Sequence, residues 1–375
     1  MLLPTRDGGR LIATALTSVL EQAGPDFEVV VADNANADET ADVLERFASD
    51  PRLRVVRSER VLPVEENWHA AWAGSRGDYL LLMDDDDCLM PGSLERLDEL
   101  LTAHGHPECL TCNGYSYLAP GVLDERASCY RDPAFAPGPE LPAGPISLEA
   151  RRAMARRPFR TLGFDIGVPL ATVMTVFARR AVERLPGSPF KTGYPDLYAL
   201  VALLLTAESW VYEPTKLVVG GVSRSSVMDS LGNGRASDAF ARLGLQSFRY
   251  AWLVAGNELL NGMVDALAQL ELDFPEEFRN VELNRSLYVT RQVWAWLRAW
   301  RAGALPRSEL MRRLRGLSGR DAAALARAPL QGATWTTAWR SARGRARGES
   351  IIGGGYDRLP EVRDVGEFAR WAAAR

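Results

Sequence analysis

Tyr79-Leu80-Leu81-Leu82-Met83-Asp84-Asp85-Asp86-Asp87 decides the fold, because an apolar run of five residues passes directly into four carboxylates. Such a run is typical of a buried parallel strand, and ligands bind beyond the carboxyl ends of strands in open α/β sheets. Two like charges about 4 Å apart repel by roughly 1 kcal/mol in water and roughly 4 kcal/mol at an effective dielectric near 20. A divalent cation reverses that cost, and Mg²⁺ or Mn²⁺ pairs carboxylates with substrate phosphates. The stretch predicts a metal–phosphate site; the alternative is a solvated acidic loop.

The residues around this stretch alternate between short apolar runs and segments of helical periodicity. We expect strands at residues 1–3, 27–32, 53–56 and 79–83, and helices at residues 11–20, 38–47, 65–73 and 93–103. Strands that alternate with helices of about ten residues predict a doubly wound, mainly parallel sheet with right-handed crossovers. The fold class is therefore α/β.

The second half of the chain is less regular. Five prolines between residues 133 and 145 indicate that residues 113–146 form a long loop or a lid. A strand is expected at 172–178, a helix at 197–207, and two strands at 210–212 and 217–219. Helical periodicity dominates beyond residue 236. These patterns predict a catalytic domain at 1–230, divided near residue 112 into a donor half (1–112) and an acceptor half (113–230), and a helical C-terminal region at 231–375.

Composition and charge restrict the class of protein. The 375 residues are 47% hydrophobic and 25% charged, as in a soluble globular protein. No apolar run reaches the ~18 residues that a membrane span needs. Four cysteines do not suggest a disulfide framework, so we expect a cytoplasmic protein. Residues 285–347 carry fourteen arginines against two acids, a net charge of +12, which leaves −16 for the rest. This asymmetry indicates an anionic partner, or reflects a GC-rich bacterial genome.

Several short motifs together resemble the inverting family 2 glycosyltransferases of the GT-A fold. The motifs are Pro4-Thr5-Arg6, Phe27 to Asn34, Glu66-Asn67-Trp68, Gly77-Asp78-Tyr79, Asp84 to Asp87 with Pro91-Gly92, and Tyr194-Pro195-Asp196. The resemblance covers roughly residues 1–230. It implies transfer of a sugar from a nucleotide diphosphate donor, with UDP favoured, to a hydroxyl or other nucleophile of a small-molecule, glycan or peptide acceptor.

The resemblance also implies roles for individual residues. Asp33 would accept a hydrogen bond from the donor base, with Thr5 and Arg6 at the adjoining strand end. Asn67 would lie near the nucleotide, and Asp84 and Asp85 beside the sugar nucleotide. Asp84 and Asp86 would form a D-x-D pair in which Asp84 lies by the ribose and Asp86 binds Mn²⁺ or Mg²⁺. Asp196 matches the catalytic base.

Residue chemistry agrees with these roles and leaves alternatives open. A carboxylate at position 33 accepts from N3–H of uracil or thymine or from N1–H of guanine, so UDP, dTDP and GDP all fit. Asp196 could instead cap the helix that follows it. Arg224 could contact the diphosphate as a fixed cation or be an ordinary surface arginine. Two departures are a short first strand and the position of all three histidines before Asp196, because some relatives use a later histidine as a metal ligand.

Other patterns are weaker. Gln246 and Arg249 match a Q-x-x-R acceptor motif of processive relatives. Cys109 and Cys112 lack the second pair that a zinc site needs, so we expect them in a strand or loop. The tryptophans and arginines of residues 287–301 suit a helix core or an anionic membrane surface, and no nucleic-acid motif is present.

Two other classes of protein compete with a glycosyltransferase. One is a sugar nucleotidyltransferase, which would be expected to carry a lysine after its first strand, and residues 5–10 contain none. The other is a catalytically silent module that binds nucleotide sugars or glycans.

Overall fold

The computed structural model describes residues 1–136, 141–163, 166–224, 226, 254, 257–328 and 355–375. Its first sheet is parallel, in the order β1 (Leu2–Thr5), β2 (Val29–Asp33), β3 (Leu53–Arg57). Helices α1 (Leu11–Leu20), α2 (Thr40–Phe47) and α3 (Val64–Gly74) connect and follow these strands. Alternate strand residues point to opposite faces: Leu3 and Val31 pack with α1 and α2, whereas Leu2 and Val30 pack with α3. The predicted βαβ arrangement of the first half is confirmed.

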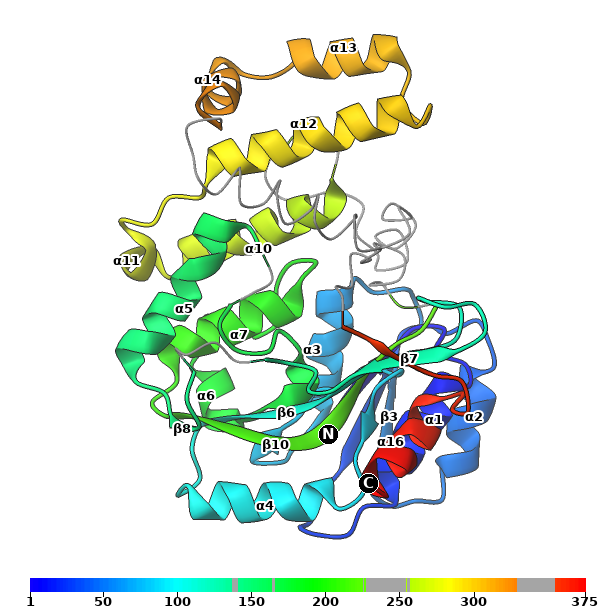
Figure 1. Ribbon diagram of the computed structural model, residues 1–375. Coiled ribbons are helices and arrows are strands. Elements are labelled where there is room, and N and C mark those ends of the chain that lie inside the picture. Colours follow the sequence, from blue (N-terminus) through cyan, green and yellow to red (C-terminus); the bar gives the residue numbers. More distant parts are fainter. Residues whose placement is uncertain (137–140, 164–165, 225, 227–253, 255–256, 329–354) are drawn as a thin grey trace.

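A larger sheet contains both parallel and antiparallel pairs (Figure 1). Its members are β4 (Tyr79–Leu80), β5 (Cys88–Leu89), β6 (Cys109–Leu118), β7 (Ser128–Arg131), β8 (Gly144–Pro145), β9 (Thr175–Ala178), β10 (Trp210–Val222) and β11 (Asp357–Leu359). Strands β6 and β10 run parallel, and the remaining pairs are antiparallel. A parallel bridge between Leu2 and Leu82 joins the two sheets. The α/β class is confirmed.

Two expectations for the second half are wrong. Residues 113–146 are not one long loop, because β6 continues to Leu118 and β7 and β8 follow within this range. The expected strands at 210–212 and 217–219 are one strand, β10, whose pairing with β6 shifts register between Tyr212 and Val218. This irregularity absorbs the polar residues that separate the two apolar runs, so hydrogen bonding continues on both sides of it.

Helix α7 (Pro195–Thr206) is buried on nearly every side and lies at the centre of the second half. It packs between α5 (Leu148–Thr161) and a helix of the C-terminal region, α10 (Glu258–Asp273). Helix α4 (Ser93–Ala103), the short α6 (Arg179–Glu183) and a 3₁₀ turn at Thr172–Met174 complete this part. An apolar helix this deeply buried fixes whatever its first turn carries.

The C-terminal region stacks on α5 and α7 and then returns to the sheet (Figure 1). Its helices α11 (Pro275–Phe278), α12 (Arg285–Arg301), α13 (Arg307–Arg315) and α14 (Gly319–Arg327) confirm the expected helical character. Strand β11 was not expected, and it pairs with β7, while α16 (Val365–Ala373) lies against α1 and β5. The domain boundary near residue 230 stays a prediction, and so does the division of the catalytic domain into a donor half and an acceptor half near residue 112.

Candidate active site

The carboxyl ends of four neighbouring strands meet at one edge. The register of the parallel sheet aligns Thr5 with Asp33 and Asp33 with Arg57. The Leu2–Leu82 bridge carries the alignment to the acidic run, and Thr5 Oγ1 donates to Asp85 Oδ2 at 2.6 Å. Asp33 is buried, accepts from Asn36 Nδ2 at 2.7 Å, and lies 3.4 Å from Arg57 Nε. Strand ends that follow apolar runs therefore assemble one polar edge, as the sequence predicts.

The acidic run is a tight turn held by backbone donors. Asp87 accepts from the amides of Asp84 and Gly221, each at 2.9 Å, and Asp86 Oδ2 accepts from the amide of Ser223 at 3.2 Å. Gly221 lies so close that a Cβ there would overlap the carbonyl oxygen of Asp86. Gly221 was not predicted to be part of the site. The available signal was a Gly-Gly pair at the end of an apolar strand, which marks close backbone approach.

The turn concentrates unneutralised acid. Asp86 and Asp87 are buried, whereas Asp84 is exposed. Although the side chain reaches the surface, neighbouring protein atoms desolvate its carboxyl, and this desolvation, followed by the charges of Asp85 and Asp196, raises the pKa of Asp84 to about 7. Burial and the neighbouring carboxylates likewise raise the pKa of Asp85 and of Asp86 to about 7. Among the described residues, no donor hydrogen-bonds to the carboxyl oxygens of Asp84, which leaves them available to a ligand.

Asp196 lies far from the acidic turn in sequence but near enough in space for its charge to act on Asp84. It lies in the first turn of α7, where its Oδ1 accepts from the Leu197 amide at 2.8 Å. Tyr194, and not Asp196, occupies the N-cap position, so the alternative of a capping aspartate is wrong. Burial raises the pKa of Asp196 to about 6, and its charge reaches Asp84. A carboxylate in partly desolvated surroundings with such a pKa suits a general base near neutral pH.

The other predicted residues are less closely connected to the acidic turn. Arg6 Nη1 donates to the Asn34 carbonyl at 3.1 Å, next to Asp33, and its buried Nε has no acceptor among the described residues. Asn67 is buried on α3 and makes no side-chain hydrogen bond to the described acidic residues. Arg224 is exposed and bonds the Gly121 carbonyl and Glu125 at 3.1 and 2.6 Å. Gln246 and Arg249 lie outside the described residues.

The carboxylates of the acidic turn fit a divalent cation that is bound partly by the protein and partly by a ligand. In the described part of the chain, no three His, Cys, Asp or Glu side chains form a group that could hold a metal by themselves. Asp84 and Asp86 nevertheless present oxygen donors whose mutual repulsion a cation would relieve. Mg²⁺ and Mn²⁺ commonly take one or two carboxylates and complete their shell with phosphates and water.

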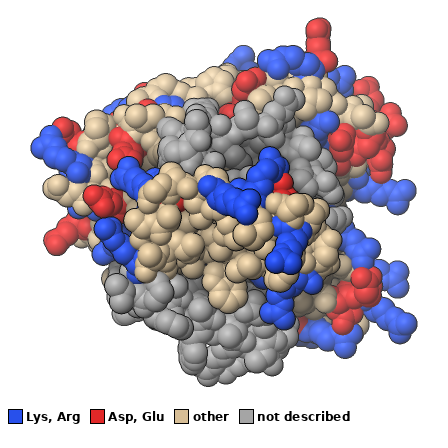
Figure 2. All heavy atoms as spheres, turned by 90° about the horizontal axis from the view of Figure 1, so that it is seen from above, with Lys and Arg blue, Asp and Glu red and all other residues tan. Residues whose placement is uncertain are grey.

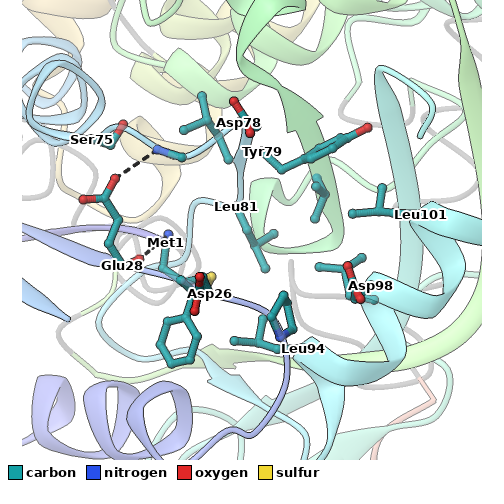
Figure 3. A pocket seen from close by; sticks show the side chains of 16 residues that line it. Met1, Asp26, Glu28, Ser75, Asp78, Tyr79, Leu81, Leu94, Asp98 and Leu101 are labelled. Atoms are coloured by element: carbon teal, nitrogen blue, oxygen red, sulfur yellow. Dashed lines mark hydrogen bonds between the residues drawn. The ribbon is translucent and has the colours of Figure 1, made fainter.

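A cavity of about 250 Å³ lies elsewhere, at the amino ends of the same strands. Figure 3 shows its lining, where Leu81, Leu94 and Leu101 form an apolar wall and Asp26 and Asp98 lie at the rim. Nearby, the Glu28 carbonyl accepts from the Met1 amine at 2.7 Å. None of the predicted site residues lines this cavity.

The four described cysteines are buried and unpaired, with Cys109 and Cys112 in β6 as expected. Burial raises the pKa of the Cys88 thiol to about 11, and it raises those of Cys109 and Cys112 as well. Thiols held in this neutral form are core residues and not nucleophiles or metal ligands.

The first part of the chain is similar to a known protein family. Residues 2–161 match the family model described as "Glycosyl transferase family 2". An uncharacterised glycosyltransferase of Haemophilus influenzae is 27% identical over 139 residues, which are 35% of this chain and 46% of that protein. The succinoglycan biosynthesis protein ExoO of Rhizobium meliloti is 34% identical over 94 residues, 25% of this chain and 27% of that one.

The chain thus spans less than half the length of these two curated relatives. Among solved structures, the crystal structure of S. aureus TarS 1–349 in complex with UDP-GlcNAc aligns with a TM-score of 0.47. The identity is 14%, over 78% of this chain and 80% of that one. Residues 2–161 are therefore similar to glycosyl transferase family 2.

Proposed function

We propose that the protein is a metal-dependent, inverting glycosyltransferase that moves a sugar from a nucleoside diphosphate donor to an acceptor nucleophile. The observation that carries the proposal is that the charge of Asp196, at the start of α7, acts on Asp84 in the acidic turn. Asp84 suits the donor diphosphate, which it would bind through a cation, and Asp196 suits the acceptor. The family of residues 2–161 supports the reaction class.

Asp196 would take the proton from the attacking hydroxyl. A general base must lie within hydrogen-bond reach of that hydroxyl and must be ionised. The anomeric carbon would lie between Asp196 and the diphosphate held beside Asp84 and Asp86, so attack opposite to the leaving group inverts the configuration. The acceptor class stays open among small molecules, glycans and peptides.

Asp84 and Asp86 would hold the cation, which offsets the negative charge that builds up on the leaving diphosphate. Thr5 and Asp85 fix the turn against β1, while Gly221 and Ser223 fix it against β10. Asp33 would accept from the donor base beside Arg6 and Asn67. We favour a UDP-sugar on the family resemblance, with dTDP- and GDP-sugars as alternatives that the chemistry of Asp33 also permits.

One assay separates the three candidate classes. The protein is incubated with a panel of NDP-sugars and Mn²⁺, and released NDP is measured. A transferase releases NDP, slowly to water when no acceptor is added, and loses this activity in Asp196→Asn and in chelator, while the exposed Asp42→Asn control keeps it. Binding of UDP without release would favour the silent module. Pyrophosphate release from an NTP and a sugar 1-phosphate would favour a nucleotidyltransferase.

The stereochemical part of the proposal has its own test. With an α-linked NDP-sugar, the product first formed should be the β-anomer, seen by ¹H NMR before mutarotation. An α-anomer as the first product would contradict inversion without affecting the assignment of the donor site.

A contact between the C-terminal helices and an anionic membrane surface is a finer proposal. None of the described helices is long and apolar enough to cross a membrane. Of the two alternatives for the tryptophans of α12, core or surface, Trp294 and Trp300 are at the surface, 53% and 42% exposed, whereas Trp296 is buried. Seen from above, the molecule shows Lys and Arg side chains spread over a largely uncharged face (Figure 2). Exposed tryptophan beside arginine is typical of helices that lie at a lipid interface.

Vesicle sedimentation tests this contact. The protein should bind phosphatidylglycerol vesicles and dissociate at high salt, and Trp294→Ala/Trp300→Ala should weaken binding. Leu272→Ala, which removes another exposed apolar side chain on α10, is the matched control. Equal binding to neutral phosphatidylcholine, or none to either, would contradict the proposal.

A further inference from the structure

The turn that carries Asp196 is held in a conformation that its own sequence does not favour. Thr192 is buried and has a φ of +67°, a left-handed conformation that a β-branched residue rarely adopts. Tyr194 and Pro195 follow and open α7, with Asp196 as the next residue. A residue in this region persists only where the surrounding structure fixes it. The relevant surroundings are therefore the contacts on either side of Asp196.

Before Asp196, the ring of Tyr194 lies against the backbone of α10. A Cβ placed on Gly262 would overlap Cε2 of that ring and lie 2.7 Å from its Cδ2. Gly262 is buried within a helix, where glycine costs about 1 kcal/mol relative to alanine. The close approach explains why glycine occupies this position. The charge of Asp196 reaches the Tyr194 phenol, so the ring that Gly262 receives is a direct neighbour of the proposed base.

The last residue of α10, Asp273, accepts hydrogen bonds from residues on both sides of the turn that carries Asp196. Asp273 accepts from Lys191 Nζ at 2.8 Å and from the Tyr198 hydroxyl at 2.6 Å. Lys191 lies five residues before Asp196, and Tyr198 lies two residues after it. The two side chains of the Lys191–Asp273 ion pair are only 16% and 15% exposed, so water screens the pair less than it screens a surface pair.

Helix α10 is itself fixed to α12. Asn257 caps its first turn, and Asn261 Oδ1 accepts from the Tyr288 hydroxyl at 2.8 Å and from Gln292 Nε2 at 2.6 Å. Asn261, Tyr288 and Gln292 are buried, and a buried polar network of this kind selects one arrangement of the helices. The position of α10 is thus defined independently of the turn that it contacts.

We propose that α10 positions the catalytic base: Gly262 and Asp273, together with Tyr194, set where Asp196 lies relative to the donor. The inference rests on the proposed function, and it gives the C-terminal region a part in the reaction. Residues 2–161 match the family, and both Asp196 and α10 lie beyond that match. Gly262, Asp273 and Tyr194 are positioning residues, because they act through Asp196 and need not touch substrate.

The test uses all 375 residues of the chain and begins with Gly262→Ala. A misplacement of about 1 Å can cost roughly 100-fold in rate, so we expect kcat to fall by about 10- to 100-fold. The donor KM and the Kd for UDP with Mn²⁺ should stay within about twofold, because the donor edge is made by other strands. Gly319→Ala is the control, since Gly319 also lies in a helix but has open space around its Cβ position.

Two further variants separate positioning from loss of structure. In the double variant Tyr194→Ala/Gly262→Ala, the methyl group should add nothing to the effect of Tyr194→Ala, since the ring it displaces is gone. Asp273→Asn keeps the shape of the side chain, and kcat should fall while the Kd for UDP stays unchanged. Asp273→Asn provides the decisive measurement if Gly262→Ala does not fold.

The outcomes distinguish this inference from the proposed function. Activity that is lost in Asp196→Asn but unchanged in both Gly262→Ala and Asp273→Asn would overturn the positioning role alone. Full activity in Asp196→Asn would overturn the assignment of the base itself. Additive effects of Tyr194→Ala and Gly262→Ala would show that Gly262 acts elsewhere in the fold.

Discussion

At the scale of single residues, the site holds carboxylates whose negative charge is unfavourable in the folded protein. Asp86 is buried, accepts a hydrogen bond from Ser223, and has a pKa near 7 because of burial and the charge of Asp84. An aspartate in an unfolded chain titrates near 3.9. Folding is therefore favoured by this group below about pH 4, and that contribution is lost as the pH rises towards 7.

Asp86→Asn should stabilise the metal-free protein. The free energy of unfolding should rise by about 1–3 kcal/mol at pH 8, because a charge that is costly to bury is removed, and the gain should vanish below about pH 4. Added Mn²⁺ should raise the Tm of the wild type more at pH 8 than at pH 5.5, and it should not change that of the variant. Calorimetry with and without Mn²⁺ measures both effects, with Asp42→Asn as control. A variant less stable than wild type at pH 8 would contradict this account.

Asp196 predicts the pH dependence of turnover. Its pKa is raised to about 6 by burial, and a general base works only when ionised. With Mn²⁺ and donor saturating, kcat should be constant above about pH 7 and should fall about tenfold per pH unit well below 6. The initial rate of NDP release gives the profile, with circular dichroism at each pH to verify folding. A flat profile between pH 5 and 8 would exclude Asp196 as the titrating base.

At the scale of elements, the acidic turn depends on how closely β10 approaches it. Gly221 in β10 donates its backbone amide to Asp87, and Ser223, just after the strand, donates its amide to Asp86. Only glycine at position 221 allows that approach. Gly220, one residue earlier, has its nearest neighbour, the Tyr115 carbonyl oxygen, 3.8 Å from a Cβ position. Two adjacent glycines of one strand therefore differ in what they can tolerate.

Gly221→Ala should separate the acidic turn from β10 and weaken binding of UDP with Mn²⁺ by at least about tenfold, since the two amide donors move away from the carboxylates. It should also destabilise the protein by about 1–3 kcal/mol, as overpacking does. Gly220→Ala should leave both quantities nearly unchanged. Titration calorimetry and thermal unfolding of the pair decide the matter, and equal behaviour of the two variants would refute the close-contact explanation.

At the scale of the whole molecule, the two ends of the chain pack together. Helix α16 lies beside α1, and its Phe368 is fully buried against Tyr115, Tyr117 and Tyr130, with ring centroids 5.3 to 5.5 Å apart. The same apolar cluster includes Cys88, which follows the acidic turn in sequence, and Val219, which lies two residues before Gly221. The last residues therefore support the strands that carry the site.

Phe368→Ala should cost about 3–5 kcal/mol of unfolding free energy, the usual penalty for emptying a buried aromatic position. Denaturant unfolding, with the exposed Glu361→Ala as control, measures the loss. Because the cluster reaches β5 and β10, UDP binding should weaken as well. A stability change below about 1 kcal/mol would mean that α16 contributes little to the fold.

The sequence by itself determined the first half of the fold and the chemistry of the edge. Apolar runs that end in Thr5, Asp33 and Asp84 predict buried strands with polar ends. This signal is local, because the length of a strand, its burial and the polarity of its last residue all follow from consecutive residues. The same holds for Asp196 at the start of an apolar helix. In these places, the local pattern and the tertiary fold agree.

Only the tertiary structure decided the second half. Strand β6 contains Thr111, Asn113 and Ser116, which interrupt its apolar pattern, yet Thr111 is buried because Trp210 Nε1 and Thr175 Oγ1 hydrogen-bond to it, each at 2.9 Å. The Gly221–Asp86 approach and the contact of Gly262 with Tyr194 likewise join residues far apart in the chain. The role of such a polar residue or glycine depends on the residue that it contacts. That contact is formed by packing between distant parts of the chain, so it cannot be inferred from the neighbouring sequence.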